Sequence, residues 1–582
     1  MKLPEIPARA GIRIAIAVPM IWLGIFLLIP FLLVLKISFA QSVIGSPPFS
    51  PLIERGDGIA RLALNWGNYA LLWSDHIYFA SYLGSLWIAL TTTLCCLLIG
   101  FPIAYALARA QPSRRPLLVA LVMLPFWTSF LIRIYAWIGI LKNHGLIEQI
   151  LHFLNLTTAP LNLLYTPSAI LIGMVYSYLP FAILPLYSTL ERIDGAALEA
   201  AEDLGASPLV RMITVLLPLA APGILAAALL VFIPAMGEYV IPELLGPSDS
   251  LMIGHVLWQE FFENRDWPAA ASVAVILLTV LVPPMLLLQR LQQDFSEQQG
   301  ASLSPKPTRL NTAILIAGLG FLFAPIISVI VYSFNASRLV TVWGGFSLRW
   351  YSELWQNDAI RHAAALSLLV GIVSATIATV LGAIAGIVLE RAPGFRGQTL
   401  LTALLAAPLV LPEVVTGLSL LLLFITSQQI FGIPTGQGFW TITIAHATFS
   451  LSFVAVVVRA RIHGLDRLLE EAAADLGASP TESFFHITLP LMTPALLSGW
   501  LLAFTLSFDD LVITSFVSGP GYSTLPMVIF SSVRLGVSPM INAFATIMVL
   551  AVSVIITAAT LIPAWKNRVA VRKQTAQIAA NA

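Results

Sequence analysis

The residues of this sequence that are most able to take part in chemistry are carboxylates inside apolar runs. Glu238, Glu243, Glu413, Asp509 and Asp510 all lie in segments long and apolar enough to cross a membrane. Ionisable groups at membrane depth are energetically expensive, and those that occur usually face a water-filled cavity. Carboxylates along such a cavity attract a cation more strongly than they would in bulk water. The pattern predicts a pathway for a small cationic substrate.

Two of these carboxylates, Glu238 and Asp510, occupy equivalent places in an internal repeat of the sequence. We expect them to approach each other across the repeat axis and to line the pathway together. The alternatives for individual carboxylates are protonation, pairing with Arg133 of the third apolar run, or a position at the outer membrane interface. Arg133 itself either binds a carboxylate or extends its guanidinium toward the interface.

Residue patterns for catalysis are missing from the sequence. It contains no G-x-x-x-x-G-K-[ST] phosphate loop, so we do not expect this chain to bind or hydrolyse ATP. No nucleophile, metal-ligand cluster or acid/base pair stands out beyond the membrane runs, which argues against an enzyme, a metal site or a resident cofactor. The only cysteines, Cys95 and Cys96, are adjacent in an apolar run and suit packing. The formal net charge of +1 does not favour nucleic acid as a partner.

A second feature is a stretch that occurs twice, at residues 199–222 and 471–494. Both copies contain Glu-Ala-Ala, Leu-Gly-Ala-Ser-Pro and Leu-Pro in the same order. A loop that only joins membrane helices needs to be polar, so membrane topology does not explain the shared residues. Ordinary helix capping could explain one copy, but it does not dictate the other residues that the two copies share. The repetition indicates that another molecule recognises both loops.

The local sequence of each copy predicts a small rigid platform. Glu, Ala and Leu favour a helix over about 198–204, and Gly205 suits the left-handed position that ends it. Ser207 is expected to cap a second helix, and Pro208 fits its first position, where a missing N–H costs little. We expect docking surfaces formed by Glu199, Ala200, Ala201, Gly205 and Pro218 in the first copy and by Glu471, Ala472, Ala473, Gly477 and Pro490 in the second.

Composition places these features in a membrane protein. Apolar residues make up 58% of the 582 residues and charged residues only 10%, which is more apolar surface than a soluble core could bury. We predict an all-α integral membrane protein with two sets of six helices. The third and fifth runs of each set are long enough to include re-entrant pieces, and prolines should kink the helices beside Glu238 and Glu413. The expected spans lie near 14–38, 79–108, 116–140, 167–190, 218–245, 269–289, 310–334, 363–389, 399–425, 438–459, 490–517 and 541–565.

Lys and Arg residues indicate the orientation. Placing both termini and both repeated loops in the cytoplasm puts most Lys and Arg on the inner side. The first run is too long for the core of a signal peptide, so we expect it to be retained as a helix. Two six-helix halves with one orientation imply a parallel repeat about a pseudo-two-fold axis along the membrane normal, with a pathway on the axis.

The predicted domains follow this repeat. We assign the first domain to residues 1–290, with its repeated loop at 191–217. A polar stretch at 291–309, rich in Gln, Ser and Pro, is expected to be a cytoplasmic linker. We assign the second domain to residues 310–582, with its repeated loop at 461–489.

The spacing of Glu-Ala-Ala, glycine and Leu-Pro resembles the cytoplasmic loop of type I ABC importer permeases. This resemblance implies that each loop forms a coupling helix seated in a groove on an ATP-hydrolysing subunit. Two ABC ATPase subunits would then bind the ATP, and the chain would lie in the cytoplasmic (inner) membrane of a bacterium. The matching residues are Glu199, Ala200, Ala201, Gly205, Val215, Leu217 and Pro218, and Glu471, Ala472, Ala473, Gly477, Ile487, Leu489 and Pro490.

Longer segments resemble a narrower group of permeases. Residues 124–137, LPFWTSFLIRIYAW, are similar to one permease subunit of spermidine/putrescine importers. Residues 332–338, 411–424 and 507–539 are similar to the other permease subunit. The chain therefore resembles two such subunits fused into one. The resemblance implies a polyamine substrate and a periplasmic or surface-tethered binding protein that delivers it.

Together these features predict transport by alternating access, driven through the two repeated loops. Within the same class, the main alternative is a fused permease for ferric ion or another small solute, because the loops say nothing about cargo. A twelve-helix secondary transporter also has parallel halves, but it would not need duplicated docking loops. A receptor or scaffold without transport is disfavoured by carboxylates placed symmetrically in the membrane.

Overall fold

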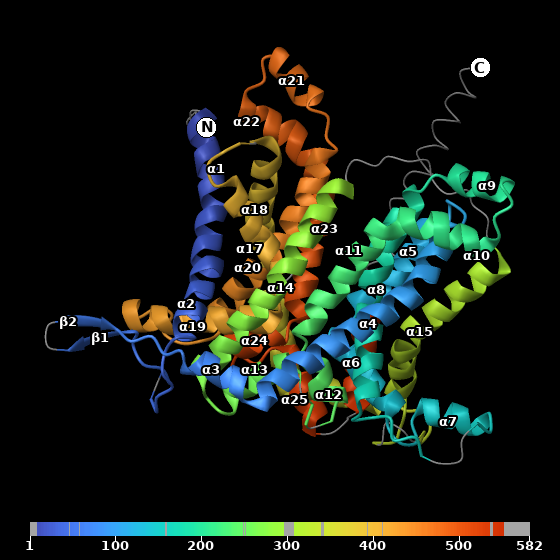
Figure 1. Ribbon diagram of the computed structural model, residues 1–582, viewed down its shortest axis with the longest axis horizontal. Helices are drawn as coiled ribbons and strands as arrows, with labels where there is room; N and C mark the ends of the chain where they lie inside the picture. Colours follow the sequence, from blue (N-terminus) through green and yellow to red (C-terminus); the bar gives the residue numbers. More distant parts are fainter. Residues whose placement is uncertain are drawn as a thin grey trace. The chain divides into compact units, whose positions relative to one another are not determined.

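The structure is a computed structural model, and it describes residues 8–45, 47–56, 59–156, 160–247, 249–250, 252–295, 308–338, 343–392, 394–409, 411–535, 539–551 and 554. In this part of the chain ten helices are long and apolar enough to cross a membrane, or eleven if a bent pair forms one span (Figure 1). The predicted all-α membrane class is confirmed. A short antiparallel hairpin, β1 (Ile53–Gly56) with β2 (Ile59–Leu62), follows the first span.

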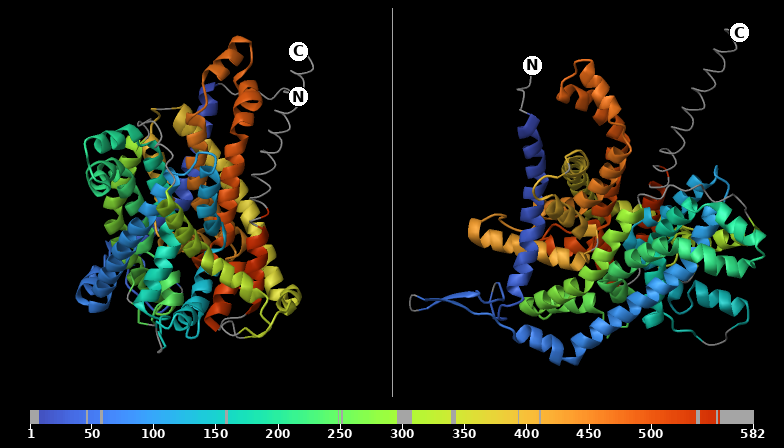
Figure 2. Two further views of the ribbon diagram at one scale, coloured as in Figure 1. Left: turned by 90° about the vertical axis from the view of Figure 1, so that its right-hand side faces the viewer. Right: turned by 45° about the horizontal axis from the view of Figure 1, so that its top comes forward.

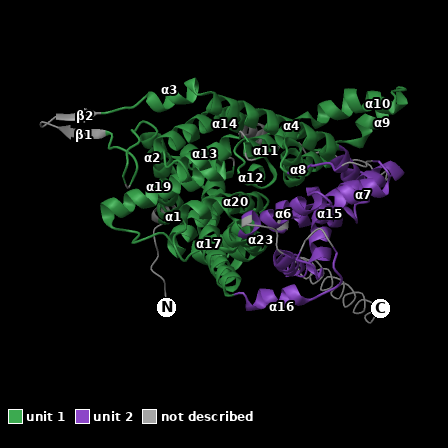
Figure 3. Ribbon diagram, turned by 90° about the horizontal axis from the view of Figure 1, so that it is seen from below, with its two compact units in different colours: residues 1–101, 165–303, 358–531 green, residues 102–164, 304–357, 532–582 purple. Residues whose placement is uncertain are grey.

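The chain forms two compact units (Figure 3). Unit 1 comprises residues 1–101, 165–303 and 358–531, and unit 2 comprises residues 102–164, 304–357 and 532–582. Besides the hairpin, the elements of unit 1 are α1 (Ala8–Leu23), η1 (Gly24–Leu28), α2 (Ile29–Ile37), α3 (Gly67–Ser74), most of α4 (His76–Ala108), α8 (Pro167–Arg192), α9 (Gly195–Asp203), α10 (Pro208–Arg211), η3 (Met212–Leu216), α11 (Leu217–Met236), α12 (Val240–Leu245), α13 (Ile253–Phe262), α14 (Trp267–Phe295), α17 (Asp358–Arg391), α18 (Gln398–Ala406), η4 (Ala407–Leu409), α19 (Glu413–Phe431), α20 (Phe439–His463), α21 (Leu468–Asp475), α22 (Pro480–Ser483), η5 (Phe484–Thr488), α23 (Leu489–Asp509), α24 (Val512–Val517) and most of α25 (Leu525–Leu535). The elements of unit 2 are the end of α4, α5 (Arg115–Met123), η2 (Leu124–Trp127), α6 (Phe130–Leu141), α7 (Leu146–Phe153), α15 (Arg309–Ser333), α16 (Arg349–Gln356) and the end of α25.

Three of the twelve predicted spans are not described as single spanning helices. The third run, 116–140, is a bent pair of helices. The ninth run, 399–425, divides into α18 and α19, of which only α19 is long enough to span. The twelfth run, 541–565, lies mostly outside the described residues, although a helix over Pro539–Ala551 is described. The predicted linker also begins later than expected: α14 extends to Phe295 because Leu and Gln favour helix, and residues 296–307 lie outside the described part.

The first helix of each sequence half packs on helices of the other half. In unit 1, α1 lies against α17 and α18, and the Trp22 indole Nε1 donates to the Thr448 hydroxyl of α20 at 3.0 Å. In unit 2, α15 lies against α6, and the rings of Trp137 and Phe321 are 5.7 Å apart. The compact units therefore do not coincide with the predicted sequence halves. A helix that is apolar all round does not specify from its own sequence which neighbour covers it.

Small residues allow α17 and α20 to approach closely within unit 1. A Cβ added at Gly382 would lie 2.7 Å from the carbonyl oxygen of Leu451. One added at Gly386 would lie 2.9 Å from the carbonyl oxygen of Ala455. Glycines four residues apart share one helix face, and such faces bring membrane helices into backbone contact where lipid provides no hydrophobic drive between them. The second repeated loop, which begins with α21, follows directly from α20 of this pair.

Four apolar runs are broken at places where irregular pieces were expected. Residues 237–239 separate α11 from α12, and residues 510–511 separate α23 from α24. The third run divides into α5, the tight turn η2 and α6, and the ninth divides in the same way. The third and fifth runs of each half are therefore broken, and the re-entrant character of their pieces stays a prediction. Broken helices at membrane depth need protein or water partners for their free backbone groups, so each break brings polar groups together inside the protein.

The repeat is visible in matching hydrogen bonds. In unit 1 the Ser38 hydroxyl is 2.6 Å from the Tyr69 hydroxyl, and in unit 2 Ser333 is 2.8 Å from Tyr351. In both units a phenylalanine that follows the serine packs its ring against the same tyrosine. Equivalent tyrosines thus anchor the end of the first helix of each half.

Candidate coupling segments and substrate pathway

The first repeated loop forms the helix pair that its residues predict. α9 begins earlier than expected because the Asp194 carboxylate caps it by accepting from the N–H of Ala196 at 3.0 Å. Gly205 ends the helix with φ +82°, a left-handed conformation that favours glycine. Ser207 then caps α10 by accepting from the N–H of Val210, with a proline at the first helical position.

The second repeated loop has the same backbone. α21 ends at Gly477, whose φ is +85°, and α22 follows directly. Ser479 and Glu482 form a reciprocal capping box: the Glu482 carboxylate accepts from the N–H of Ser479 at 2.8 Å, and the Ser479 hydroxyl accepts from the N–H of Glu482. We call the two helix pairs, α9 with α10 and α21 with α22, the coupling segments.

Both coupling segments expose an apolar tip. Leu204 and Leu476 are equivalent residues at the ends of α9 and α21, and 88% and 89% of their surfaces are exposed. These two leucines give the coupling segments exposed apolar surface at matching places. The predicted docking residues that are exposed around these tips are Glu199, Ala200, Gly205, Pro218, Glu471, Ala472, Gly477 and Pro490, whereas Ala201 is half-buried and Ala473 is buried.

Each coupling segment continues into a membrane helix through a wide turn. η3 and η5 are single π-helical turns directly before α11 and α23. Pro218 and Pro490 are the second residues of these helices, and a proline has no N–H and clashes with the carbonyl four residues earlier. A wider turn removes that clash. The shared Leu-Pro therefore has a backbone function in addition to any contact.

The two coupling segments differ in their place within unit 1. Figure 1 shows α21 with α22 at the top, near the beginning of α1, and α9 lower at the right, with α10 below it. Both views in Figure 2 show the second coupling segment, in orange, at the top and the first, in green, lower. The cytoplasmic placement of both segments and both termini stays a prediction.

Glu238 sits at the break between α11 and α12. One carboxylate oxygen, Oε1, accepts from the N–H groups of Val240 and Ile241 at 3.0 and 3.4 Å, which caps the short α12. The other, Oε2, accepts from the hydroxyl of Tyr178 in α8 at 2.5 Å. Glu238 therefore holds the broken helix in place, and its charge lies at the point where the helix changes direction.

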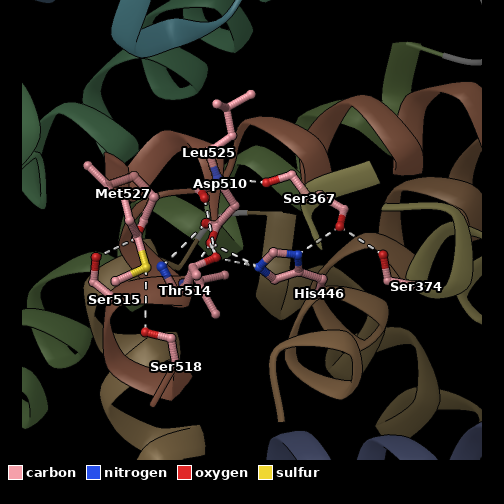
Figure 4. Close-up of polar contacts among 12 residues, drawn as sticks. Ser367, Ser374, His446, Asp510, Thr514, Ser515, Ser518, Leu525 and Met527 are labelled. Carbon is pink, nitrogen blue, oxygen red and sulfur yellow. Dashed lines mark hydrogen bonds and ion pairs between the residues drawn. The ribbon is translucent and has the colours of Figure 1, made fainter. Parts of the chain in front are cut away.

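Asp510 occupies the equivalent break between α23 and α24 (Figure 4). Its Oδ2 accepts from the N–H and the hydroxyl of Thr514, each at 2.7 Å, and lies 3.0 Å from Nε2 of His446. Nδ1 of His446 lies 2.7 Å from the Ser507 hydroxyl, to which Ser374 of α17 donates at 2.8 Å. A buried polar chain thus connects α17, α23, α20 and α24 through the imidazole.

Glu413 joins these two carboxylates in one acidic cluster. It is the first residue of α19, its side chain is exposed, and it interacts electrostatically with Asp510, Glu238 and Asp509. The preceding residue, Pro412, lies against the other break, because a Cβ at Gly237 would meet the proline ring at 2.4 Å. Breaks from the fifth, ninth and eleventh runs therefore meet around Glu413. Whether Glu238 and Asp510 face each other across an axis stays a prediction.

Glu243 and Arg133 have other surroundings. The Glu243 carboxylate of α12 is 2.9 Å from Nε2 of His255 in α13, and both side chains are almost buried. Arg133 belongs to unit 2, where it is 4% exposed and its guanidinium lies 5.6 and 5.7 Å from the ring centres of Phe126 and Phe130. Such contacts between a cation and aromatic rings stabilise a buried arginine. The pathway role of both residues stays a prediction.

Comparison with protein-family models matches the sequence to binding-protein-dependent transport system inner membrane components. The match occurs twice, over residues 100–297 and 378–568, and each matched segment contains one coupling segment. Together the two segments cover more than half of the chain. The chain belongs to this family.

Three curated relatives are each about half as long as this chain. The putrescine transport system permease protein PotI of Escherichia coli (strain K12) is 55% identical over 242 residues, which are 42% of this chain and 86% of PotI. The spermidine/putrescine transport system permease protein PotB of Salmonella typhimurium (strain SL1344) is 40% identical over 268 residues, 46% of this chain and 88% of PotB. PotC of Escherichia coli (strain K12), of the same described system, is 42% identical over 259 residues, 44% of this chain and 96% of PotC. This binding-protein-dependent permease is therefore a fused pair of permease repeats.

Sequence reasoning found the carboxylates of this inner membrane component but not the side chains that hold them. Tyr178 and His446 lie inside apolar runs and contact Glu238 and Asp510 across the fold. The available signal was the presence of polar or ionisable residues in an apolar run. His446 is one of them, and several Ser and Thr residues flank it. The partner of each carboxylate could not be read from spacing.

Proposed function

We propose that this chain forms the membrane pathway of an ATP-driven importer in a bacterial inner membrane, with its coupling segments docked on two ABC ATPase subunits in the cytoplasm. The observation that carries the proposal is the pair of equivalent, leucine-tipped coupling segments with matching left-handed glycines. The ATPase subunits would bind the ATP, because this sequence has no phosphate loop. Both chain termini would lie in the cytoplasm.

We further propose that the substrate is a polyamine such as putrescine or spermidine. The acidic cluster around Glu413 would attract a small cation, and Glu413 is the carboxylate of the cluster with an exposed side chain. The names of the relatives PotI, PotB and PotC support the same substrate class. A periplasmic or surface-tethered binding protein would deliver the polyamine, as the description of the family indicates.

The geometry supports a lever mechanism for alternating access. Continuous helices over Pro208–Met236 and Pro480–Asp509 join each coupling segment to the break that carries Glu238 or Asp510. At 1.5 Å per residue each lever is roughly 45 Å long. ATP binding would draw the ATPase subunits and the coupling segments together, so the levers would tilt and the breaks at their far ends would move. The acidic cluster would then face the outside in one state and the cytoplasm in the other.

The test is purification of the tagged chain from its native membrane, followed by transport in proteoliposomes. We expect ABC ATPase subunits to co-purify at two copies per chain, and labelled putrescine uptake to require ATP. Glu199→Lys with Glu471→Lys should abolish uptake while the chain still inserts. Uptake that follows an ion gradient in ATP-depleted vesicles would show a secondary transporter instead, and competition by ferric chelates but not by polyamines would change the substrate class.

A further inference from the structure

One carboxylate ties the second coupling segment to two membrane helices. Oε1 of Glu470, in α21, accepts from Nη2 of Arg391 at 3.2 Å and from the hydroxyl of Thr488 at 2.8 Å. Arg391 is the last residue of α17, and Thr488 is the last residue of η5, directly before α23. The arginine side chain is 18% exposed and the glutamate side chain 34%. A single oxygen atom thus links the coupling segment to α17 and α23.

Glu390, which directly precedes Arg391 in the chain, strengthens the same junction. Oε1 of Glu390 lies 2.8 Å from Nδ1 of His463, and Oε2 accepts from Nε of Arg459 at 3.4 Å. The backbone carbonyl of Glu390 accepts from Nη2 of Arg467, which precedes α21. Two consecutive residues at the end of α17 therefore hold α20 on one side and the second coupling segment on the other.

An open cavity beside this junction makes the polar link important. Its volume is about 380 Å³, and it separates parts of α17 and α20 from the second coupling segment. Where atoms are not in contact, dispersion forces cannot resist relative movement. Movement of α21 relative to α17 is therefore opposed here by the Glu470 hydrogen bonds together with the bond from Arg467 to the Glu390 carbonyl. Residues lining the cavity include Ile387, Arg391, Ile462, Glu470, Ser483 and Phe484.

The first coupling segment has no equivalent of this carboxylate. In the register that aligns Glu199 with Glu471, Glu470 corresponds to Leu198 and Thr488 to Leu216. Leucine side chains neither donate nor accept hydrogen bonds. The first segment instead has an ion pair within itself, between Arg211 and Glu202. The two coupling segments therefore share a backbone but differ in their attachment to the membrane helices.

We propose that Glu470 is a positioning residue that transmits movement of the second coupling segment to both α17 and α23. The inference rests on the proposed function, because it requires an ATPase that moves the segment. In the first coupling segment leucines stand at the positions of Glu470 and Thr488, so this carboxylate link belongs to the second segment. Replacing Glu470 with leucine, the residue of the first repeat, would remove the link without changing the docking surface.

The experiment compares Glu470→Leu with Glu470→Gln in the complex purified through a tag on this chain and reconstituted in proteoliposomes. The measured quantity is putrescine transported per ATP hydrolysed. For Glu470→Leu we expect this ratio to fall about tenfold, because the bonds to a charged group are lost, while the amount of bound ATPase stays unchanged. Glu470→Gln keeps an oxygen acceptor for Arg391 and Thr488, so its ratio should fall only about threefold or less. Asp358→Leu is the control, since it removes an exposed ion pair with Arg361 at the opposite end of α17.

Hydrogen exchange of the purified chain in nanodiscs provides a second readout. Glu470→Leu should speed exchange at 468–476 and 484–488 and leave 195–203 unchanged. Faster exchange with an unchanged transport ratio would overturn the proposal, because the link would then stabilise the segment without transmitting movement. Unchanged exchange would also overturn it. An absence of ATPase from the purified wild-type complex is a different result, which refutes the proposed function itself.

Discussion

The exposed tips of the coupling segments allow a quantitative prediction. Leu204 and Leu476 are 88% and 89% exposed, so truncating them should leave the folding of this chain almost unchanged. If each side chain is buried on docking, its removal costs about 2 kcal/mol of binding free energy. That is roughly 30-fold in affinity for Leu204→Ala or Leu476→Ala. Because each tip docks on its own ATPase subunit, the double variant should lose roughly 30-fold in affinity at both sites.

The assay is a titration of the ATPase subunit onto the permease in nanodiscs, with thermal unfolding measured alongside. Leu98→Ala is the matched control, since Leu98 is 65% exposed on the membrane helix α4 and should not contact the ATPase. A double variant that binds the ATPase with wild-type affinity would refute the docking role of the tips. A large loss of thermal stability in either single variant would refute the claim that the tips are free in the isolated chain.

Three further predictions concern the acidic cluster and the turn of the second segment. Glu413→Gln should raise the KM for putrescine uptake about tenfold, because one favourable Coulomb contact is lost; an unchanged KM would remove this residue from the pathway. Glu238→Gln combined with Asp510→Asn keeps the oxygen acceptors that cap α12 and α24 but removes two charges, so uptake should slow while the chain remains folded. Unaltered affinity and rate in that double variant would mean that these carboxylates only cap helices. Gly477→Ala places a side chain at φ +85°, which costs about 1 kcal/mol, so ATPase binding should weaken several-fold in the same titration; tight binding would show that the segment tolerates a different turn.

The coupling segments were predictable because their structure is local. The left-handed glycines, the serine caps and the prolines in the first helical turns all act over a few residues, and the structure has each of them as expected. The start of α9 was placed too late, because Asp194 was not recognised as its cap. The breaks in the third and fifth runs do not follow from length alone, because α4 and α17 are at least as long and are unbroken.

The acidic residues were predictable as a group, and their individual contacts were not. Spacing placed Glu238 and Asp510 at equivalent positions, but it did not indicate that Tyr178 and His446 would bind them or that both would cap short helices. Glu243 was grouped with the others by its location in an apolar run, yet its nearest partner is His255. Partners of this kind come from other helices, so their identity depends on how the helices pack.

The sequence alone determined the membrane class, the duplication, the family and the backbone of the coupling segments, because hydropathy, repetition and helix capping are all encoded in neighbouring residues. Only the tertiary structure decided that α1 and α15 each pack on the opposite half, that three breaks meet around Glu413, and that Glu470 links one coupling segment to two membrane helices. These contacts join residues far apart in the chain. Apolar helices present similar surfaces to many possible neighbours, so the choice among them is made by the packing of the whole bundle.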